Sequence, residues 1–247
     1  MPKSKAVAVQ LATPEIDEFA KYSLANVRAY CSRHGYAHYV QRRHTVPGMH
    51  INWSKIDLLR HVFTRFPEAE YFILFDADII VQDFSKSIDY FLDKYGDDDT
   101  HIFFAADTPL RLSLKARPNA GLIILKNSEI GKKIIDRWIE ASVTDGAKYN
   151  DTHPRNQLVY WNCVMPRFEK YQKVLPRSFF VKPLYVLGKQ IMPTAFLYHL
   201  TQSDKSTRAR EMKRMSTAVR QETNRDVKET EKILAEKKDY LLLREAT

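Results

Sequence analysis

Two aspartates separated by one small residue, Asp76-Ala77-Asp78, directly follow the strongly apolar run Tyr71-Phe72-Ile73-Leu74-Phe75. Alternate residues of an extended chain project to the same side, so the two carboxylates can converge. Carboxylate oxygens select a hard divalent cation such as Mg²⁺ or Mn²⁺, which completes its shell with waters and substrate phosphates. Ala77 is small and leaves room for a phosphate. The alternative is that the aspartates cap a loop or helix, because Asp-x-Asp alone is a weak motif.

The chain around this motif alternates between strand-like and helix-like stretches. Alternation of this kind predicts an α/β sandwich with a mostly parallel central sheet, in which ligands lie beyond the carboxyl ends of the strands. Thr13-Pro14 predicts a capping residue followed by a proline in the first helical turn. The expected strands cover residues 6–12, 36–40, 71–75, 102–106 and 121–125, and the expected helices cover 16–34, 53–66, 87–95 and 130–139.

The formal net charge of +9 raises the possibility of nucleic-acid binding, so the distribution of charge matters. Residues 203–247 hold 12 Lys or Arg against 9 Asp or Glu, and the remaining excess is spread over the rest of the chain. Without a dense basic patch we expect no nucleic-acid partner. A mildly basic surface also suits an enzyme that binds a diphosphate or an anionic acceptor.

The composition also bounds the domain organisation and the location. We expect one main domain over residues 1–202 and a charged helical extension over 203–247, which contains neither glycine nor proline. The chain shows neither a signal-peptide pattern nor an apolar run of roughly 18 to 20 residues, which predicts a soluble, cytoplasmic protein without a transmembrane anchor. Cys31 and Cys163 are far apart and predict neither a disulfide framework nor a metal site.

A series of short motifs occurs in one consistent order between His34 and His199. As an ordered set it resembles the GT-A-fold glycosyltransferases, and within them the galactosyl-, mannosyl- and xylosyltransferase family of the yeast galactomannan and mannan enzymes, with kinship to the glycogenin-like group. The motifs are His34-Gly35-Tyr36, Trp53-Ser54-Lys55 with Leu59-Arg60, the segment Glu70 to Ile80, the segment Asn119 to Ser128 with Trp138, His153-Pro154-Arg155-Asn156-Gln157, and His199.

The resemblance implies a GT-A fold, which is a Rossmann-like, mostly parallel sheet flanked by helices, here with a C-terminal helical extension. It also implies Mn²⁺ or Mg²⁺ as cofactor and a nucleotide-diphosphate sugar as donor, with a UDP-sugar favoured. Asp76 and Asp78 would hold the cation, and His199 would be the third protein ligand. Lys205 lies at the spacing of the diphosphate-binding lysine of the glycogenin-like group, but the glycine-rich, proline-flanked motif of that group is absent.

Other positions acquire expected roles from the same resemblance. The segment Leu11-Ala12-Thr13 would pass its backbone under the nucleoside. Lys55 would contact the base or the phosphates, or else be a solvated helix lysine. Asp107 and Asn119 would face the sugar hydroxyls, or else hydrogen-bond their own backbone.

Gln157 matches the family's glutamine beside the anomeric carbon. The acidic residue that usually precedes it is replaced here by Asn156, which cannot act as a carboxylate nucleophile. We therefore expect retention of configuration by front-face substitution, in which the acceptor oxygen attacks on the side that the diphosphate leaves. The main catalytic effect would then be electrostatic stabilisation of the leaving group.

Two alternatives to a glycosyltransferase stay open at this level. A phosphotransfer enzyme of haloacid-dehalogenase type also places Asp-x-Asp after a strand, although usually after the first strand of the domain. A non-catalytic protein of the same fold could bind a nucleotide sugar or, through its basic helices, a nucleic acid. The favoured partners are a nucleotide-sugar donor and a glycan or glycoprotein acceptor, and the oligomeric state is left open.

Overall fold

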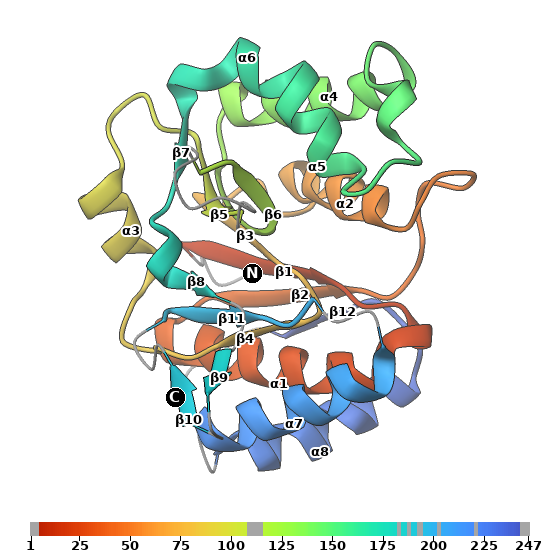
Figure 1. The fold of residues 1–247 in the computed structure, drawn as a ribbon, viewed down its shortest axis with the longest axis vertical. Helices are drawn as coiled ribbons and strands as arrows, with labels where there is room; N and C mark the ends of the chain where they lie inside the picture. Colours follow the sequence, from red (N-terminus) through yellow and green to blue (C-terminus); the bar gives the residue numbers. More distant parts are fainter. Residues whose placement is uncertain are drawn as a thin grey trace.

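The computed structural model describes residues 5–107, 116–181, 184–186, 189–191, 195–201, 204–219 and 222–242 (Figure 1). The strands are β1 Ala6–Leu11, β2 Ala37–Gln41, β3 Tyr71–Phe75, β4 Ile79–Val81, β5 Ile102–Ala106, β6 Pro118–Lys126, β7 Gln172–Val174, β8 Phe180–Val181, β9 Leu184–Val186, β10 Lys189–Ile191, β11 Leu197–His199 and β12 Tyr240–Leu242. The α-helices are α1 Asp17–His34, α2 Asn52–Arg65, α3 Ile88–Tyr95, α4 Glu129–Val143, α5 Asn156–Val159, α6 Met165–Phe168, α7 Lys205–Val219 and α8 Glu222–Ala235.

The main sheet has seven strands in the order β12-β2-β1-β3-β6-β5-β7. Strand β1 pairs in parallel with β2 and β3, and β5 pairs in parallel with β7. Strand β6 lies antiparallel between β3 and β5, and β12 lies antiparallel to β2. Five of the seven strands therefore run in one direction, which confirms the expected mostly parallel sheet.

Helices cover both faces of the sheet, as the continuous apolar runs of the central strands require. Helices α2 and α4 lie on one face, and α1 lies on the other with α7 and α8 beyond it (Figure 1). Alternate residues of β1 divide between the two cores, since Val7 and Val9 face α2 while Ala6 and Ala8 face α1. Burying a side chain of the size of valine contributes about 1.5 to 3 kcal/mol, so the two cores hold the sheet that carries the site in place.

The first helix begins and ends as its sequence dictates, with one difference from expectation. A 3₁₀ turn, Pro14–Ile16, precedes α1, and Thr13 is extended but makes no side-chain capping hydrogen bond. Thr13 therefore holds the expected N-cap position with Pro14 in the first turn, but without a side-chain capping bond. Gly35 ends α1 in the left-handed conformation (φ 70°), which a glycine adopts without the steric cost of a side chain.

A small second sheet, β4-β11-β8, was not expected from the sequence. Strand β4 follows Asp78 directly and pairs antiparallel with β11, so that His199 lies opposite Ile79. The backbone N–H of Leu200 also donates to the carbonyl of Asp78 at 2.9 Å. This pairing brings residues that are far apart in the sequence to the end of β3.

The C-terminal segment packs on α1 rather than projecting from the domain. Helices α7 and α8 both contact α1, and Met212 and Met215 of α7 are buried. Strand β12 then joins the edge of the main sheet, whereas the sequence analysis expected helices alone in this segment. The division into 1–202 and 203–247 stays a prediction, and its boundary residues 202 and 203 lie outside the described residues.

In the part of the chain that the structure describes, no helix has both the length and the apolar character that a bilayer crossing requires. Cys31 and Cys163 are buried free thiols. The cytoplasmic location stays a prediction.

Candidate active site

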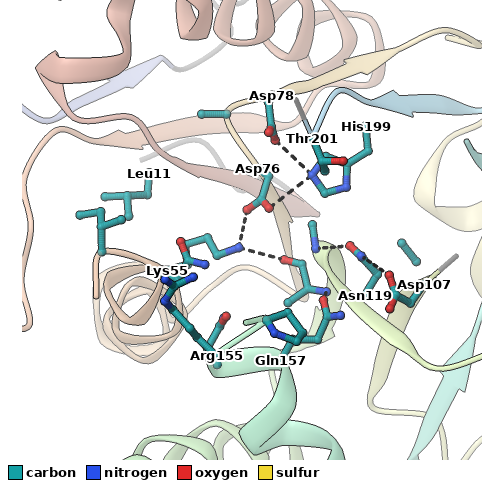
Figure 2. A pocket seen from close by; sticks show the side chains of 18 of the residues that line it. Leu11, Lys55, Asp76, Asp78, Asp107, Asn119, Arg155, Gln157, His199 and Thr201 are labelled. Atoms are coloured by element: carbon teal, nitrogen blue, oxygen red, sulfur yellow. Dashed lines mark hydrogen bonds and ion pairs between the residues drawn. The ribbon is translucent and has the colours of Figure 1, made fainter. Parts of the chain in front are cut away.

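The two aspartates lie in the turn that joins β3 to β4, at the carboxyl end of β3 (Figure 2). The backbone N–H of Asp76 donates to the carbonyl of Gly121 at 2.8 Å, which ties this turn to β6. A cleft of about 750 Å³ opens at this point, and Asp76, Ala77 and Asp78 line it. The motif therefore lies where an α/β fold places its ligands.

His199 completes a cluster with the two aspartates, as the family resemblance implied (Figure 2). Its Nε2 lies 3.1 Å from Oδ1 of Asp78 and 3.6 Å from Oδ2 of Asp76. One potential ligand atom from each of the three residues lies within 4.8 Å of the other two. Two carboxylates and one imidazole at this separation can converge on one divalent cation.

Gly121 of β6 is the residue that makes room for His199. A Cβ atom at this position would lie 2.5 Å from Cε1 and 2.8 Å from Nδ1 of His199, closer than such atoms can approach. From the sequence, Gly121 was placed at the start of a strand and within the family-like segment Asn119 to Ser128, without a role of its own. A lone glycine inside an apolar strand does indicate close approach of another group, and that signal could have identified it.

The charges within the cluster stabilise one another. Burial by itself would raise the pKa of Asp78, but the neighbouring His199 and, less strongly, Arg208 lower it below its usual value. Burial would lower the pKa of His199, and the charge and hydrogen bond of Asp78 together with the charge of Asp76 raise it. The carboxylates of this site therefore lie beside positively charged side chains that favour their ionised form.

Lys55 of α2 reaches the same cluster from the other side (Figure 2). Its ammonium donates to Oδ1 of Asp76 at 2.7 Å and to the carbonyl of Ala120 at 3.5 Å. Only 12% of the side chain is exposed, so the alternative of a solvated helix lysine was wrong.

Asp107 and Asn119 lie together in the cleft wall (Figure 2). Nδ2 of Asn119 donates to Oδ1 of Asp107 at 3.0 Å, and Oδ1 of Asn119 accepts from the backbone N–H of Gly121 at 2.8 Å. Asn119 thus bonds its local backbone, as one alternative held, while both side chains also face the cleft.

Gln157 and Asn156 begin helix α5 and are both buried in the cleft wall. Oε1 of Gln157 accepts from the backbone N–H of Ala120 at 2.9 Å, and the backbone carbonyl of Asn156 accepts from the indole of Trp138 at 2.8 Å. Nδ2 of Asn156 has no hydrogen-bond partner among the described residues. These bonds hold the start of α5 against β6.

The end of β1 contributes to the cleft only in part. Leu11 and Thr13 line it, but Ala12 does not, because it is fully buried. The carbonyl of Ala12 instead accepts a hydrogen bond from the guanidinium of Arg42.

Lys205, the first residue of α7, does not line the cleft, and its ammonium donates to the backbone carbonyl of Glu15 at 3.2 Å. Arg208, about one helical turn later, does line the cleft. NH1 of Arg208 lies 3.7 Å from Oδ2 of Asp78, and its guanidinium carbon lies 4.8 Å from the ring centroid of Phe19. The spacing of three residues on one helix could have pointed to Arg208.

Several other cleft residues received no individual role from the sequence. Arg155 is notable among them because it has a left-handed φ of 52°, a conformation that is strained for a non-glycine residue and is often found at functional sites. The further lining residues without an assigned role include Ile51, Asn52, His153, Trp161, Phe180, Thr201 and Arg208.

Comparison with known proteins agrees with this geometry. The sequence pattern of the galactosyl transferase GMA12/MNN10 family matches residues 6–99. The chain is 28% identical over 138 residues to the probable alpha-1,6-mannosyltransferase MNN10 of Saccharomyces cerevisiae, covering 47% of this chain and 35% of that protein. It is 23% identical over 196 residues to an alpha-1,2-galactosyltransferase of Schizosaccharomyces pombe, covering 67% of this chain and 51% of that protein. The chain thus spans about a third to a half of the length of these relatives.

Solved structures establish the fold. A glycosyltransferase involved in the glycosylation of the major capsid of PBCV-1 superposes with a TM-score of 0.69 at 19% identity, covering 85% of this chain and 98% of that chain. The glycosyltransferase GlyE of Streptococcus pneumoniae superposes with a TM-score of 0.56 at 11% identity, covering 98% of this chain and 67% of that chain. The galactosyltransferase LgtC, in complex with donor and acceptor sugar analogues, superposes with a TM-score of 0.51 at 11% identity, covering 89% of this chain and 99% of that chain. The chain has the GT-A fold, as the resemblance implied.

Proposed function

We propose that this chain is a metal-dependent glycosyltransferase that moves a hexose or pentose from a nucleotide-diphosphate sugar, preferably a UDP-sugar, to a hydroxyl of a glycan or glycoprotein. The observation that carries the proposal is the cluster of Asp76, Asp78 and His199, whose ligand atoms lie within 4.8 Å of one another at the cleft. The names of the relatives support the reaction class over phosphotransfer and over simple binding.

The residues of the cluster fit a divalent cation. Two carboxylate oxygens suit Mn²⁺ and Mg²⁺ alike, and the imidazole of His199 favours Mn²⁺, which accepts nitrogen ligands more readily than Mg²⁺ does. A bound cation would stabilise negative charge on the leaving diphosphate.

Two basic side chains of the chain itself flank the cluster. Two ionised carboxylates offset one divalent cation, so Lys55 and Arg208 are left to face the two negative charges of a donor diphosphate. Their side chains are only 12% and 19% exposed, and charges removed from water attract an anion more strongly than exposed charges do. We therefore assign to Arg208 the diphosphate contact that the sequence analysis gave to Lys205.

The remaining predicted contacts keep their proposed roles where the residues line the cleft. Leu11 and Thr13 would contact the nucleoside, and Asp107 and Asn119 would bind sugar hydroxyls. Gln157 would lie beside the anomeric carbon.

Front-face substitution with retention is the stereochemical course that these residues favour. The carboxylates among the described cleft residues belong to Asp76, Asp78 and Asp107. The first two are assigned to the cation, and Asp107 is bonded to Asn119. In a front-face reaction the acceptor oxygen forms a bond to the anomeric carbon as the bond to the diphosphate oxygen breaks, and the acceptor proton passes to the leaving oxygen. NMR of the anomeric configuration of the product tests this course, and inversion would exclude it.

Thermal unfolding with UDP-, GDP- and dTDP-sugars, each with and without Mn²⁺, tests the proposal as a whole. A ligand that binds only the folded state at 100 times its Kd stabilises that state by about 2.7 kcal/mol. We expect a Mn²⁺-dependent rise in Tm with a UDP-sugar, lost in Asp78→Asn. Asp83→Asn is the matched control, because Asp83 pairs with Lys86 outside the cleft. The absence of a shift with every nucleotide sugar would overturn the proposal.

A further inference from the structure

Trp161 differs from the other tryptophans of the chain in its exposure. The chain has three, and Trp53 and Trp138 are buried in the core at 2% and 0% exposure. Trp161 is only partly buried, and it lines the cleft. A large aromatic ring is thus accessible within the cleft that holds Asp76 and Asp78.

Trp161 is fixed in place by the strand that carries the predicted sugar-binding residue. Its indole N–H donates to the carbonyl of Pro118 at 2.8 Å. Gln157, four residues earlier on the same helical face, accepts from the N–H of Ala120. The two side chains therefore bind alternate residues of β6, on either side of Asn119. This arrangement places the indole beside the residues that would hold the transferred sugar.

The helix is locally widened where Trp161 lies. Residues Tyr160–Val164 form a π-helix between α5 and α6, in which the N–H of Met165 donates to the carbonyl of Tyr160. Pro166 accounts for the interruption of the α-helix at this point. Proline has no N–H to continue the α-helical hydrogen bonds, and its ring crowds the preceding turn. Short π-helices of this kind frequently occur at functional sites.

An exposed arginine lies against the same ring. The guanidinium carbon of Arg117 is 5.1 Å from the ring centroid of Trp161, and Arg117 itself is exposed. A cation–π contact at an exposed position is weak, so a ligand can displace it. A guanidinium beside an aromatic surface also supplies hydrogen-bond donors for hydroxyl groups.

We propose that Trp161 is the platform on which the acceptor binds. A pyranose ring of the acceptor would lie with its apolar C–H face on the indole, while Arg117 donates hydrogen bonds to its hydroxyls. This inference rests on the proposed function, and it identifies the acceptor class as a glycan that presents a pyranose ring.

Intrinsic fluorescence tests the platform without depending on turnover. The full chain, saturated with Mn²⁺ and UDP, is titrated with methyl mannosides, galactosides and glucosides and with the matching disaccharides. Because Trp53 and Trp138 are buried, we expect the blue shift and the reduced acrylamide quenching to come from Trp161, and both to be absent in Trp161→Phe. The lack of a response to any glycoside in the wild-type protein would overturn the inference. A response that persists in Trp161→Phe would overturn it equally.

Kinetics separate this inference from the proposed function. In Trp161→Ala we expect acceptor KM to rise at least tenfold, with Mn²⁺–UDP affinity and donor hydrolysis within about twofold of wild type. Phe168→Leu is the matched control. Phe168, on α6, packs on the same hydrophobic core as Trp161 but does not line the cleft. Unchanged acceptor KM in Trp161→Ala would reject the platform, whereas failure of the wild-type protein to bind Mn²⁺–UDP would reject the donor site instead.

Discussion

The imidazole of His199 lies so close to Gly121 that it leaves no space there for a Cβ atom. This contact joins β11 to β6 and determines where the third predicted ligand of the cation can lie. The space at Gly121 is therefore part of the candidate metal site.

Replacing Gly121 with Ala should displace His199 and weaken Mn²⁺ binding by on the order of 10- to 100-fold, as losses in ligand positioning do. Isothermal titration with Mn²⁺ measures the effect. Gly96→Ala is the control, because a Cβ there would meet the carbonyl of Leu92 at 2.6 Å, outside the cleft. The control should lose stability and keep its Mn²⁺ affinity, and equal losses in both variants would contradict the prediction.

Replacing Lys55 with Ala should have opposite effects on two ligands. The ammonium competes with a cation for Asp76, so Mn²⁺ alone should bind on the order of tenfold more tightly, a change of about 1.4 kcal/mol. UDP in the presence of saturating Mn²⁺ should bind more weakly, because one positive charge is lost. Calorimetry of both ligands checks the signs, with Lys86→Ala as the control outside the cleft. Parallel changes in the two affinities would exclude competition at Asp76.

Replacing Arg208 with Ala should weaken UDP binding more than UMP binding, because the guanidinium is assigned to the diphosphate. A hydrogen bond to a charged group contributes about 1.5 to 3 kcal/mol, which corresponds to roughly 10- to 150-fold in Kd. Lys205→Ala, three residues earlier on the same helix, should leave both affinities near wild type. The reverse ranking of the two variants would restore the sequence-based assignment to Lys205.

Acid should destabilise the fold through His38, a buried histidine far from the predicted metal ligands in sequence. Its Nε2 lies 2.9 Å from Oε1 of Gln10, and burial, followed by the charge of Arg28, lowers its pKa from 6.5 to about 3. The unfolded chain binds the proton more tightly, so stability is complete above about pH 6.5 and falls as the pH drops toward 3. The free energy of unfolding, measured in urea between pH 4.5 and 7, should change less with pH in His38→Gln than in the wild type. The glutamine keeps a donor for Gln10. If the free energy of unfolding depends on pH equally in the variant and the wild type, the acid sensitivity belongs to other groups.

The sequence was sufficient to predict the parts of the fold that local patterns determine. The apolar run before Asp76 predicted β3, and Gly35 predicted the end of α1, because each depends on residues next to it in the chain. Strand β12 was missed, since a three-residue strand at a sheet edge is formed by pairing with β2 rather than by its own periodicity.

The candidate site divides in the same way. Asp76 and Asp78 could be proposed from the sequence because both directly follow one strongly apolar strand. The positions of Lys205 and Arg208 depend on how α7 lies on α1, which involves packing between distant segments. Spacing along the chain pointed to Lys205, whereas in the structure the side chain that pairs with Asp78 is that of Arg208.

Strand β12 has a consequence for how the protein folds during synthesis. It follows every other described element, so the ribosome has produced the rest of the sheet before β12 can cover the edge of β2. An uncovered strand edge is a template for pairing with other chains, and nascent proteins are most exposed to aggregation at this stage. His199 and Arg208 also emerge late, so the cleft gains its full set of charged groups only as this edge is about to be covered.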